Sequence, residues 1–263
     1  MAHSTETYEG LKITDGKEDS TQDVLTSEYP LHIHVNGEPF TVTMQTPGSE
    51  IFLALGLLYN EGYFSQNEVP LVSIIEEVDD RVTRLNVELS ESEGQRAANK
   101  RSLLSAASCG ICGKKELEQI EGERLVINSA VEASKIEAMF GTMSQNQAAF
   151  VASGGSHAAA LFDSNFELLA VQEDVGRHNA VDKAVGQLLD QGILKQTQFL
   201  LVSGRVSYEI VTKCFMSRIP YLAAVSAPST LAVDFSKEFG ITLLGFCREN
   251  RCTVYSHPNR IKV

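Results

Sequence analysis

The sequence lacks the features of a membrane or secreted protein. No run of about 18 apolar residues occurs, so no membrane span is expected. The five cysteines are an odd number with one close pair, which argues against a disulfide framework and favours a reducing cytoplasm. Residues 1–28 hold seven acidic and two basic side chains and no apolar segment, so we expect a disordered acidic lead-in rather than a signal peptide.

Basic charge is also scarce. The chain has 22 lysines and arginines against 34 aspartates and glutamates, which gives a formal net charge of -12. Nucleic acid and anionic membranes repel such a protein, so neither is an expected partner. Arginines that occur inside glycine-rich motifs therefore stand out as candidate ligand contacts.

The most reactive stretch is a CxxC motif formed by Cys109 and Cys112. Two thiols at this spacing can share a metal ion, form a small disulfide, or carry and release sulfur. Residues 113–121 are typical of a helix start, and its positive end, with lysines on both flanks, favours a reactive thiolate. The pattern favours a nucleophilic or sulfur-carrying cysteine over two alternatives, half of a zinc site and inert packing.

The other cysteines offer the CxxC motif no obvious zinc ligands. Cys214, Cys247 and Cys252 are scattered, and no second CxxC or HxxxH motif occurs. Cys214 lies among apolar residues of an expected helix, which favours core packing. Cys247 and Cys252 flank the last turn of the chain and are interpreted as ordinary thiols.

Hydrophobic periodicity predicts two α/β parts. Residues 29–133 are expected to form a small α+β domain that carries the CxxC motif on a mobile loop, and residues 134–263 a three-layer α/β domain with a mixed sheet. The expected strands of the first part are 31–35, 40–44, 69–75 and 81–89, with a helix over 51–59. The second part is expected to have strands over 158–162, 168–174, 198–203, 221–226, 241–247 and 253–256, and helices over 134–147, 179–191, 206–218 and 230–240.

Ligands of such sheets bind at the carboxyl ends of the strands, in the loops that precede helices. The candidate loops are 154–157, 173–179, 203–207, 226–230 and 246–251. They contain Arg177, Arg205, Arg248 and Arg251 beside glycine and serine, which suits the binding of phosphate. The sequence therefore predicts an anionic ligand such as a nucleotide.

Structural roles remain as alternatives for several residues of these loops. His157 and His178 could be capping histidines, and Asp174 could cap the helix that follows it. Asp182 and Lys183 could be a surface ion pair.

Four motifs in collinear order resemble the FdhD family, the formate dehydrogenase accessory sulfurtransferases. They are 108–114 (SCGICGK), 173–183 (EDVGRHNAVDK), 203–209 (SGRVSYE) and 226–233 (SAPSTLAV), and the likeness runs from about residue 29 to the C-terminus. One departure is Arg218, where the family pattern has glycine at a helix end.

The resemblance implies a cytoplasmic sulfur carrier. It implies loading by a cysteine desulfurase, with Cys109 as the persulfide cysteine and Cys112 as its partner in transfer. The implied acceptor is Mo-bis(molybdopterin guanine dinucleotide), or its tungsten analogue, destined for formate dehydrogenase. The residues that we expect to bind this cofactor are Phe246, Cys247, Arg248, Glu249, Asn250, Arg251, Ser203, Gly204, Arg205 and His178.

The resemblance also implies a cytidine-deaminase-like C-terminal domain without zinc. Deaminase chemistry needs H-x-E and P-C-x-x-C motifs, whereas Ala180 follows His178 and Asn179 where the glutamate belongs. A zinc-dependent nucleoside deaminase is therefore disfavoured. The remaining alternative is a molybdenum cofactor-binding chaperone without sulfur chemistry, and a homodimer is an expected assembly.

Overall fold

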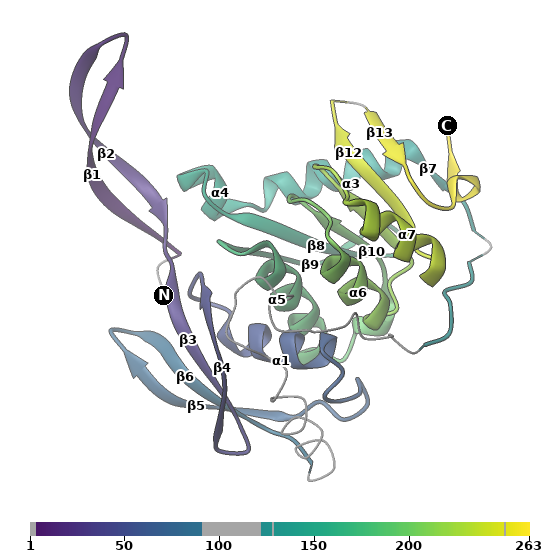
Figure 1. Cartoon of the computed structure of the whole chain (residues 1–263), viewed down its shortest axis with the longest axis horizontal. Coiled ribbons are helices and arrows are strands. Elements are labelled where there is room, and N and C mark those ends of the chain that lie inside the picture. Colours follow the sequence, from purple (N-terminus) through teal and green to yellow (C-terminus); the bar gives the residue numbers. More distant parts are fainter. Residues whose placement is uncertain (1–3, 91–121, 128, 250) are drawn as a thin grey trace.

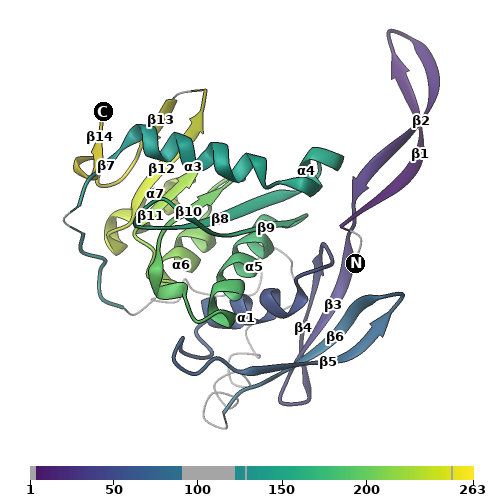
Figure 2. The same cartoon turned by 180° about the vertical axis from the view of Figure 1, so that it is seen from behind.

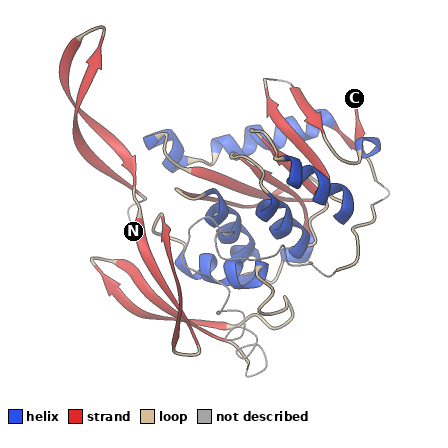
Figure 3. Ribbon diagram, in the orientation of Figure 1, coloured by secondary structure: helices blue, strands red, loops and turns tan. Residues whose placement is uncertain are grey.

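The computed structural model describes residues 4–90, 122–127, 129–249 and 251–263. These form a four-stranded sheet, a six-stranded sheet and two two-stranded sheets, with helices between and around them (Figures 1 and 3). The predicted CxxC loop and the helix after it lie outside the described residues. None of the helices in the described ranges has the length and apolarity needed to cross a membrane.

The N-terminal sheet is organised by the turn at Asn36-Gly37. Asn36 and Gly37 adopt positive φ angles of 51° and 82°, which a two-residue hairpin turn requires. The sheet has the order β4-β3-β6-β5, with β3 (Tyr29–Val35), β4 (Glu38–Gln45), β5 (Leu71–Val78) and β6 (Arg81–Glu88). The predicted strands of this part are therefore confirmed within two or three residues.

The larger sheet is mixed, as the alternation of strands and helices predicts. It has the order β13-β12-β11-β10-β8-β9, and β10, β11 and β12 are parallel. Its strands are β8 (His157–Asp163), β9 (Leu168–Asp174), β10 (Thr197–Val202), β11 (Tyr221–Ala224), β12 (Thr242–Arg248) and β13 (Arg251–Val254). The helices and short elements around it are α3 (Ala133–Gln145), α4 (Ala148–Ser153), α5 (Arg177–Asp190), α6 (Tyr208–Met216), α7 (Thr230–Phe239), β7 (Val131–Glu132), β14 (Ile261–Lys262), η1 (Leu194–Gln196) and η2 (Pro258–Arg260).

Helices cover both faces of the larger sheet. On one face Leu161, Leu200 and Leu222 belong to a core shared with α5 and α6. On the other face, which is nearer the viewer in Figure 2, Phe162 and Leu201 pack in the same cluster as residues of α3. Successive apolar side chains of a strand point to opposite faces of the sheet, as expected for a sheet that is buried on both faces. A cytidine-deaminase-like relationship stays a prediction.

Helix α1 (Glu50–Asn60) joins the N-terminal sheet to the larger sheet by packing against α5. The approach is close enough to depend on glycine. A Cβ on Gly56 would lie 1.8 Å from the Asp182 carbonyl oxygen, and a Cβ on Gly186 would lie 1.8 Å from the Phe52 carbonyl oxygen. One hydrophobic core therefore contains residues from both sides of the predicted boundary at 133/134; the two-part division remains a prediction.

Residues 5–26 form a hairpin, so the prediction of a disordered lead-in over residues 1–28 is wrong for them. Strand β1 (Thr5–Thr14) pairs with β2 (Lys17–Thr26) through a turn at Asp15-Gly16, whose φ angles are 51° and 76°. This turn has the positive φ angles of a two-residue hairpin, and Asp-Gly is a favoured sequence there. The hairpin extends away from the rest of the chain in Figure 1, and its base is hydrogen-bonded to α4 through Thr26 and Ser153, 2.6 Å apart.

Arg218, the residue that departs from the pattern expected by resemblance, has a left-handed backbone at the end of α6. Its φ is 57°, and its guanidinium Nη1 donates to the Glu123 carbonyl oxygen at 2.6 Å. The guanidinium also lies 5.5 Å from the centre of the Phe215 ring. These contacts offset the cost of the left-handed backbone at a residue that is not glycine.

Candidate functional site

The predicted ligand loops meet at one edge of the larger sheet. The parallel strands β10, β11 and β12 all end there, at Val202, Ala224 and Arg248. The antiparallel strand β8 begins at the same edge, because His157 pairs with Asp174 at the end of β9. The topology therefore brings together all five loops named from the sequence.

Backbone hydrogen bonds fix these loops against one another. The Val206 amide donates to the Ala227 carbonyl oxygen at 3.1 Å, and the Ser229 amide donates to the Val206 carbonyl oxygen at 2.9 Å. The Phe246 amide donates to the Ser226 carbonyl oxygen at 3.1 Å. Because three successive loops share these bonds, the edge is a defined surface rather than a set of independent turns.

The side chains of Arg177 and His157 lie beside Gly204 at this edge. A Cβ on Gly204 would lie 3.3 Å from both the Arg177 Cβ and the His157 Nδ1 atom, so glycine allows the two side chains to approach the backbone. The Arg177 Nε atom is buried without a hydrogen-bond partner within the described part of the chain. Burial and the charges of Arg177 and Arg205 lower the pKa of His157. An anionic group placed here would be attracted by Arg177 and Arg205 and would favour protonation of His157.

His178 is a neutral group at the start of α5. Its Nε2 atom lies 3.3 Å from the Ser207 hydroxyl. Burial, with the charges of Lys213 and Arg177, lowers the pKa of His178 to about 4, although Glu209 acts in the opposite direction. At neutral pH the ring is uncharged and keeps one N–H donor. Its hydrogen bond to Ser207 joins the loop before α5 to the loop before α6.

The end of β12 presents an aromatic ring and charged groups. Phe246 is 37% exposed and has a φ of 54°, a strained value for an aromatic residue. Arg248 and Arg251 are opposite each other across the hairpin and both are exposed, and Arg251 pairs with Glu249 at 3.4 Å. Asn250 lies outside the described residues. Strain of this kind concentrates where a backbone is shaped for binding.

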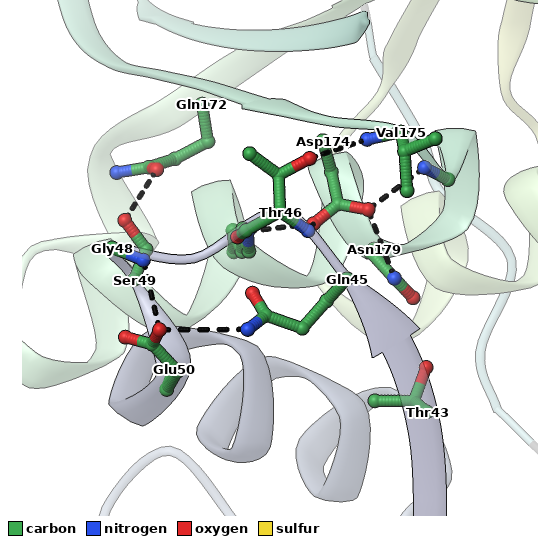
Figure 4. A network of polar contacts seen from close by, with 12 residues as sticks. Thr43, Gln45, Thr46, Gly48, Ser49, Glu50, Gln172, Asp174, Val175 and Asn179 are labelled. Carbon is green, nitrogen blue, oxygen red and sulfur yellow. Dashed lines mark hydrogen bonds and ion pairs between the residues drawn. The ribbon is translucent and has the colours of Figure 1, made fainter. Parts of the chain in front are cut away.

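Asp174 is part of a buried clamp (Figure 4) rather than a helix cap or a ligand contact. Its carboxylate is fully buried, pairs with the Lys183 Nζ at 2.6 Å, and accepts from the backbone N–H groups of Thr46 at 3.0 Å and Gly176 at 2.7 Å. The Asn179 side chain donates to it at 3.0 Å. The clamp ties the end of β4 to the loop that carries the predicted site.

The interpretation of Asp182 and Lys183 as a surface pair is wrong. Both are 1% exposed, and Lys183 pairs with Asp174 whereas Asp182 pairs with Lys213 at 2.7 Å. The Asn60 side chain of α1 also donates to Asp182 at 2.7 Å. Burial raises the pKa of Asp182, and Lys213 counteracts it. These residues join α1, α5 and α6 beneath the site.

Glu173 has a role that sequence reasoning missed. It accepts from the Ala149 and Phe150 backbone N–H groups, both at 2.8 Å, and from the Ser156 hydroxyl at 2.7 Å. These donors include free N–H groups of the first turn of α4, so Glu173 caps that helix from a distant strand. The separation of more than twenty residues explains why no local sequence signal reveals it.

The candidate catalytic cysteines Cys109 and Cys112 lie outside the described residues, so their roles stay predictions. The interpretation of Cys214 as a core residue is confirmed, because it is fully buried and burial raises the pKa of its thiol. Of the ten predicted cofactor-binding residues, nine are described: eight lie on loops or strand ends at this one sheet edge, and His178 lies in the first turn of α5 beside it.

The fold and the site define an α/β protein with a basic edge on a mixed sheet. The model of the FdhD/NarQ family matches residues 26–262, so the chain belongs to the FdhD/NarQ family. The chain is 39% identical to a sulfur carrier protein FdhD of Streptomyces avermitilis, over 99% of this chain and 97% of that one. It is 39% identical to a sulfur carrier protein FdhD of Sulfolobus acidocaldarius, over 95% of this chain and 96% of that one.

A solved structure shares the fold. It is described as a formate dehydrogenase accessory protein from Desulfotalea psychrophila, and it superposes with a TM-score of 0.76 over 99% of this chain and 100% of that one. The two sequences are 21% identical, so this likeness concerns the fold alone.

Proposed function

We propose that this chain is a sulfur carrier that accepts sulfur from a cysteine desulfurase and transfers it to a molybdenum or tungsten cofactor with two guanine dinucleotides, for use by formate dehydrogenase. The observation that carries the proposal is the near full-length similarity to relatives named sulfur carrier protein FdhD. The basic edge of the sheet adds a place for the phosphates of the acceptor. The proposed setting is the cytoplasm.

The sulfur-carrying step is assigned to the CxxC motif. The thiolate of Cys109 attacks the terminal sulfur of the desulfurase persulfide, and the desulfurase cysteine leaves as a thiolate. Cys109 then holds the persulfide, and Cys112 assists its release to the acceptor. The S–S bond that forms on Cys109 replaces the one that breaks on the desulfurase, so no external oxidant or reductant is required at this step.

The acceptor is assigned to the basic edge, where it is bound as a substrate. Arg177 and Arg205 beside Gly204 would hold phosphate oxygens, and the neutral ring of His178 would donate one hydrogen bond. The exposed ring of Phe246 offers a surface on which a guanine base can stack. Cys247, Arg248, Glu249, Asn250 and Arg251 complete the proposed segment together with Ser203.

Binding of guanosine diphosphate tests the assignment of the edge. Titration calorimetry on the purified full-length chain should show binding that Arg205→Gln weakens about tenfold to a hundredfold, since one charge-assisted hydrogen bond to phosphate contributes about 1.5–3 kcal/mol. Arg84→Gln is the matched control, because Arg84 lies on β6 of the other sheet and loses the same charge. Equal weakening by both substitutions would mean that only net charge matters, and it would contradict a site at this edge.

A double substitution distinguishes the sulfur carrier from a cofactor-binding chaperone without sulfur chemistry. Cys109→Ser with Cys112→Ser should keep guanosine diphosphate affinity and lose activation of formate dehydrogenase. If the double variant still activates the dehydrogenase, the chaperone function is favoured and the sulfur-carrier function is contradicted.

A further inference from the structure

The last hairpin of the chain places two cysteines opposite each other. Gly245 pairs with Thr253 and Arg248 pairs with Arg251, so two residues of β12 face one residue of β13 between these pairs. The two are Phe246 and Cys247, and the one is Cys252. This is a β-bulge, and the left-handed Phe246 is the residue that makes it.

Both thiols lie on the same side of the sheet. Cys247 is 6% exposed and belongs to the apolar cluster beneath α3, and Cys252 packs against that cluster while remaining partly exposed. Each thiol influences the pKa of the other, so the two groups are neighbours. Phe246 and Arg248, the neighbours of Cys247, are exposed.

The strand geometry suits a covalent link. Residues that face each other on antiparallel strands have Cα atoms about 4.5–5.5 Å apart. Disulfides join residues whose Cα atoms are about 4.4–6.8 Å apart. Two thiols on the same face of such a strand pair need little movement of the backbone to form a disulfide.

We propose that Cys247 and Cys252 are a second redox-active dithiol, which forms an intramolecular disulfide by exchange with a small-molecule disulfide such as oxidised glutathione. It is chemically separate from the CxxC motif and does not rest on the proposed function, because neither a sulfur donor nor a nucleotide takes part.

The exchange has two steps that balance without any further reactant. The Cys252 thiolate, on the more exposed residue, attacks one sulfur of oxidised glutathione and releases one glutathione thiolate. The Cys247 thiolate then attacks the Cys252 sulfur of this mixed disulfide and releases the second glutathione. Two protein thiols are oxidised, one glutathione disulfide is reduced to two thiols, and the two thiol protons are transferred to the released glutathione.

The surroundings of the pair predict a slow reaction. Burial raises the pKa of Cys247 to about 12 and also raises the pKa of Cys252, so both groups are protonated at neutral pH. Because the thiolate is the attacking species, the rate should increase with pH, about tenfold per pH unit below the pKa. A pair of this kind forms a disulfide under sustained oxidation rather than in rapid turnover.

The disulfide would link β12, which ends at Arg248, to β13, which begins at Arg251. Only the tip of the hairpin lies between the two cysteines, so the link would restrict the segment that carries both arginines. The oxidation state of the pair is therefore a variable that nucleotide-binding measurements on this protein have to control.

Peptide mapping distinguishes this disulfide from every other one that the chain can form. The wild-type full-length protein is incubated with oxidised glutathione at pH 8.5, alkylated, and digested with trypsin without reduction. Trypsin cleaves after Lys237, Arg248, Arg251 and Arg260, so a Cys247–Cys252 disulfide joins peptides 238–248 and 252–260 into one species that reduction separates. A disulfide within the CxxC motif stays inside the single peptide 102–114, and Cys214 lies in peptide 214–218 as an internal control.

The expected result is the joined species, formed faster at pH 8.5 than at pH 7 and absent in Cys252→Ser. Cys214 should remain without a disulfide and be recovered alkylated after denaturation, because its thiol is fully buried in the core. The inference is overturned if Cys252 is recovered only as a mixed disulfide with glutathione, or if both cysteines are recovered alkylated after prolonged oxidation. Neither of those results bears on guanosine diphosphate binding, which tests the proposed function separately.

Discussion

Replacing Gly186 by alanine should destabilise the protein more than any ordinary glycine-to-alanine change in a helix. A Cβ at this position would lie 1.8 Å from the Phe52 carbonyl oxygen and 2.9 Å from the Gly56 amide nitrogen, about 1.6 Å short of ordinary contact at 3.4 Å in the first case. These are backbone atoms, so α1 and α5 must separate and leave the buried Val185 and Leu55 less well packed. Overpacking costs about 1–3 kcal/mol when side chains can yield, so we expect a loss of at least about 3 kcal/mol.

Gly141→Ala is the matched control for this substitution. Gly141 lies inside α3, and a Cβ there would meet no heavy atom within 4 Å. Alanine should therefore stabilise the protein by about 0.5–1 kcal/mol through its helix propensity. Urea unfolding of wild type and both variants gives the two differences. A Gly186→Ala variant as stable as wild type would refute the contact between α1 and α5.

The buried charges give further predictions. Asp174→Asn should lower the free energy of unfolding in urea by about 3–5 kcal/mol, because it leaves the Lys183 charge buried without its partner. The double variant Asp174→Asn with Lys183→Met should lose less stability than the single variant. An equal or greater loss in the double variant would contradict a coupled pair. The pKa of His178 is lowered from 6.5 to about 4, so as the pH falls through this window the unfolded chain takes up a proton before the folded one does. The contribution of His178 to the free energy of unfolding should therefore be complete above pH 6.5 and decrease towards pH 4 by at most about 3 kcal/mol. In urea unfolding at a series of pH values, His178→Gln should make the free energy of unfolding depend less on pH over that range.

Local patterns predicted most of the longer elements but missed the hairpin of β1 and β2 and the short helix α4. The turn at Asn36-Gly37 joins two alternating strands and was identifiable from the sequence. The turn at Asp15-Gly16 has the same positive φ angles, yet the acidic composition around it favoured disorder. High net charge and low hydrophobicity indicate that a segment can bury little apolar surface, and this favours disorder. The hairpin instead depends on backbone pairing between β1 and β2.

The edge where the candidate loops meet was predictable because it follows from topology. Parallel strands bring their carboxyl ends to one edge, and the residues in those loops could be named without side-chain coordinates. The buried pairs could not be predicted in this way. Asp182 and Lys183 are adjacent in sequence, but neighbours on a helix point about 100° apart, so each pairs with a different element, Asp182 with Lys213 and Lys183 with Asp174.

Mass spectrometry after sulfur loading tests the sulfur-carrier proposal most directly. The intact mass of wild type, Cys109→Ala and Cys112→Ala is compared after incubation with a cysteine desulfurase and cysteine. The account predicts that wild type gains the mass of one sulfur atom, which reduction removes, and that Cys109→Ala gains none. Labile sulfur on Cys109→Ala, or no gain on wild type in the presence of an active desulfurase, would contradict Cys109 as the carrier.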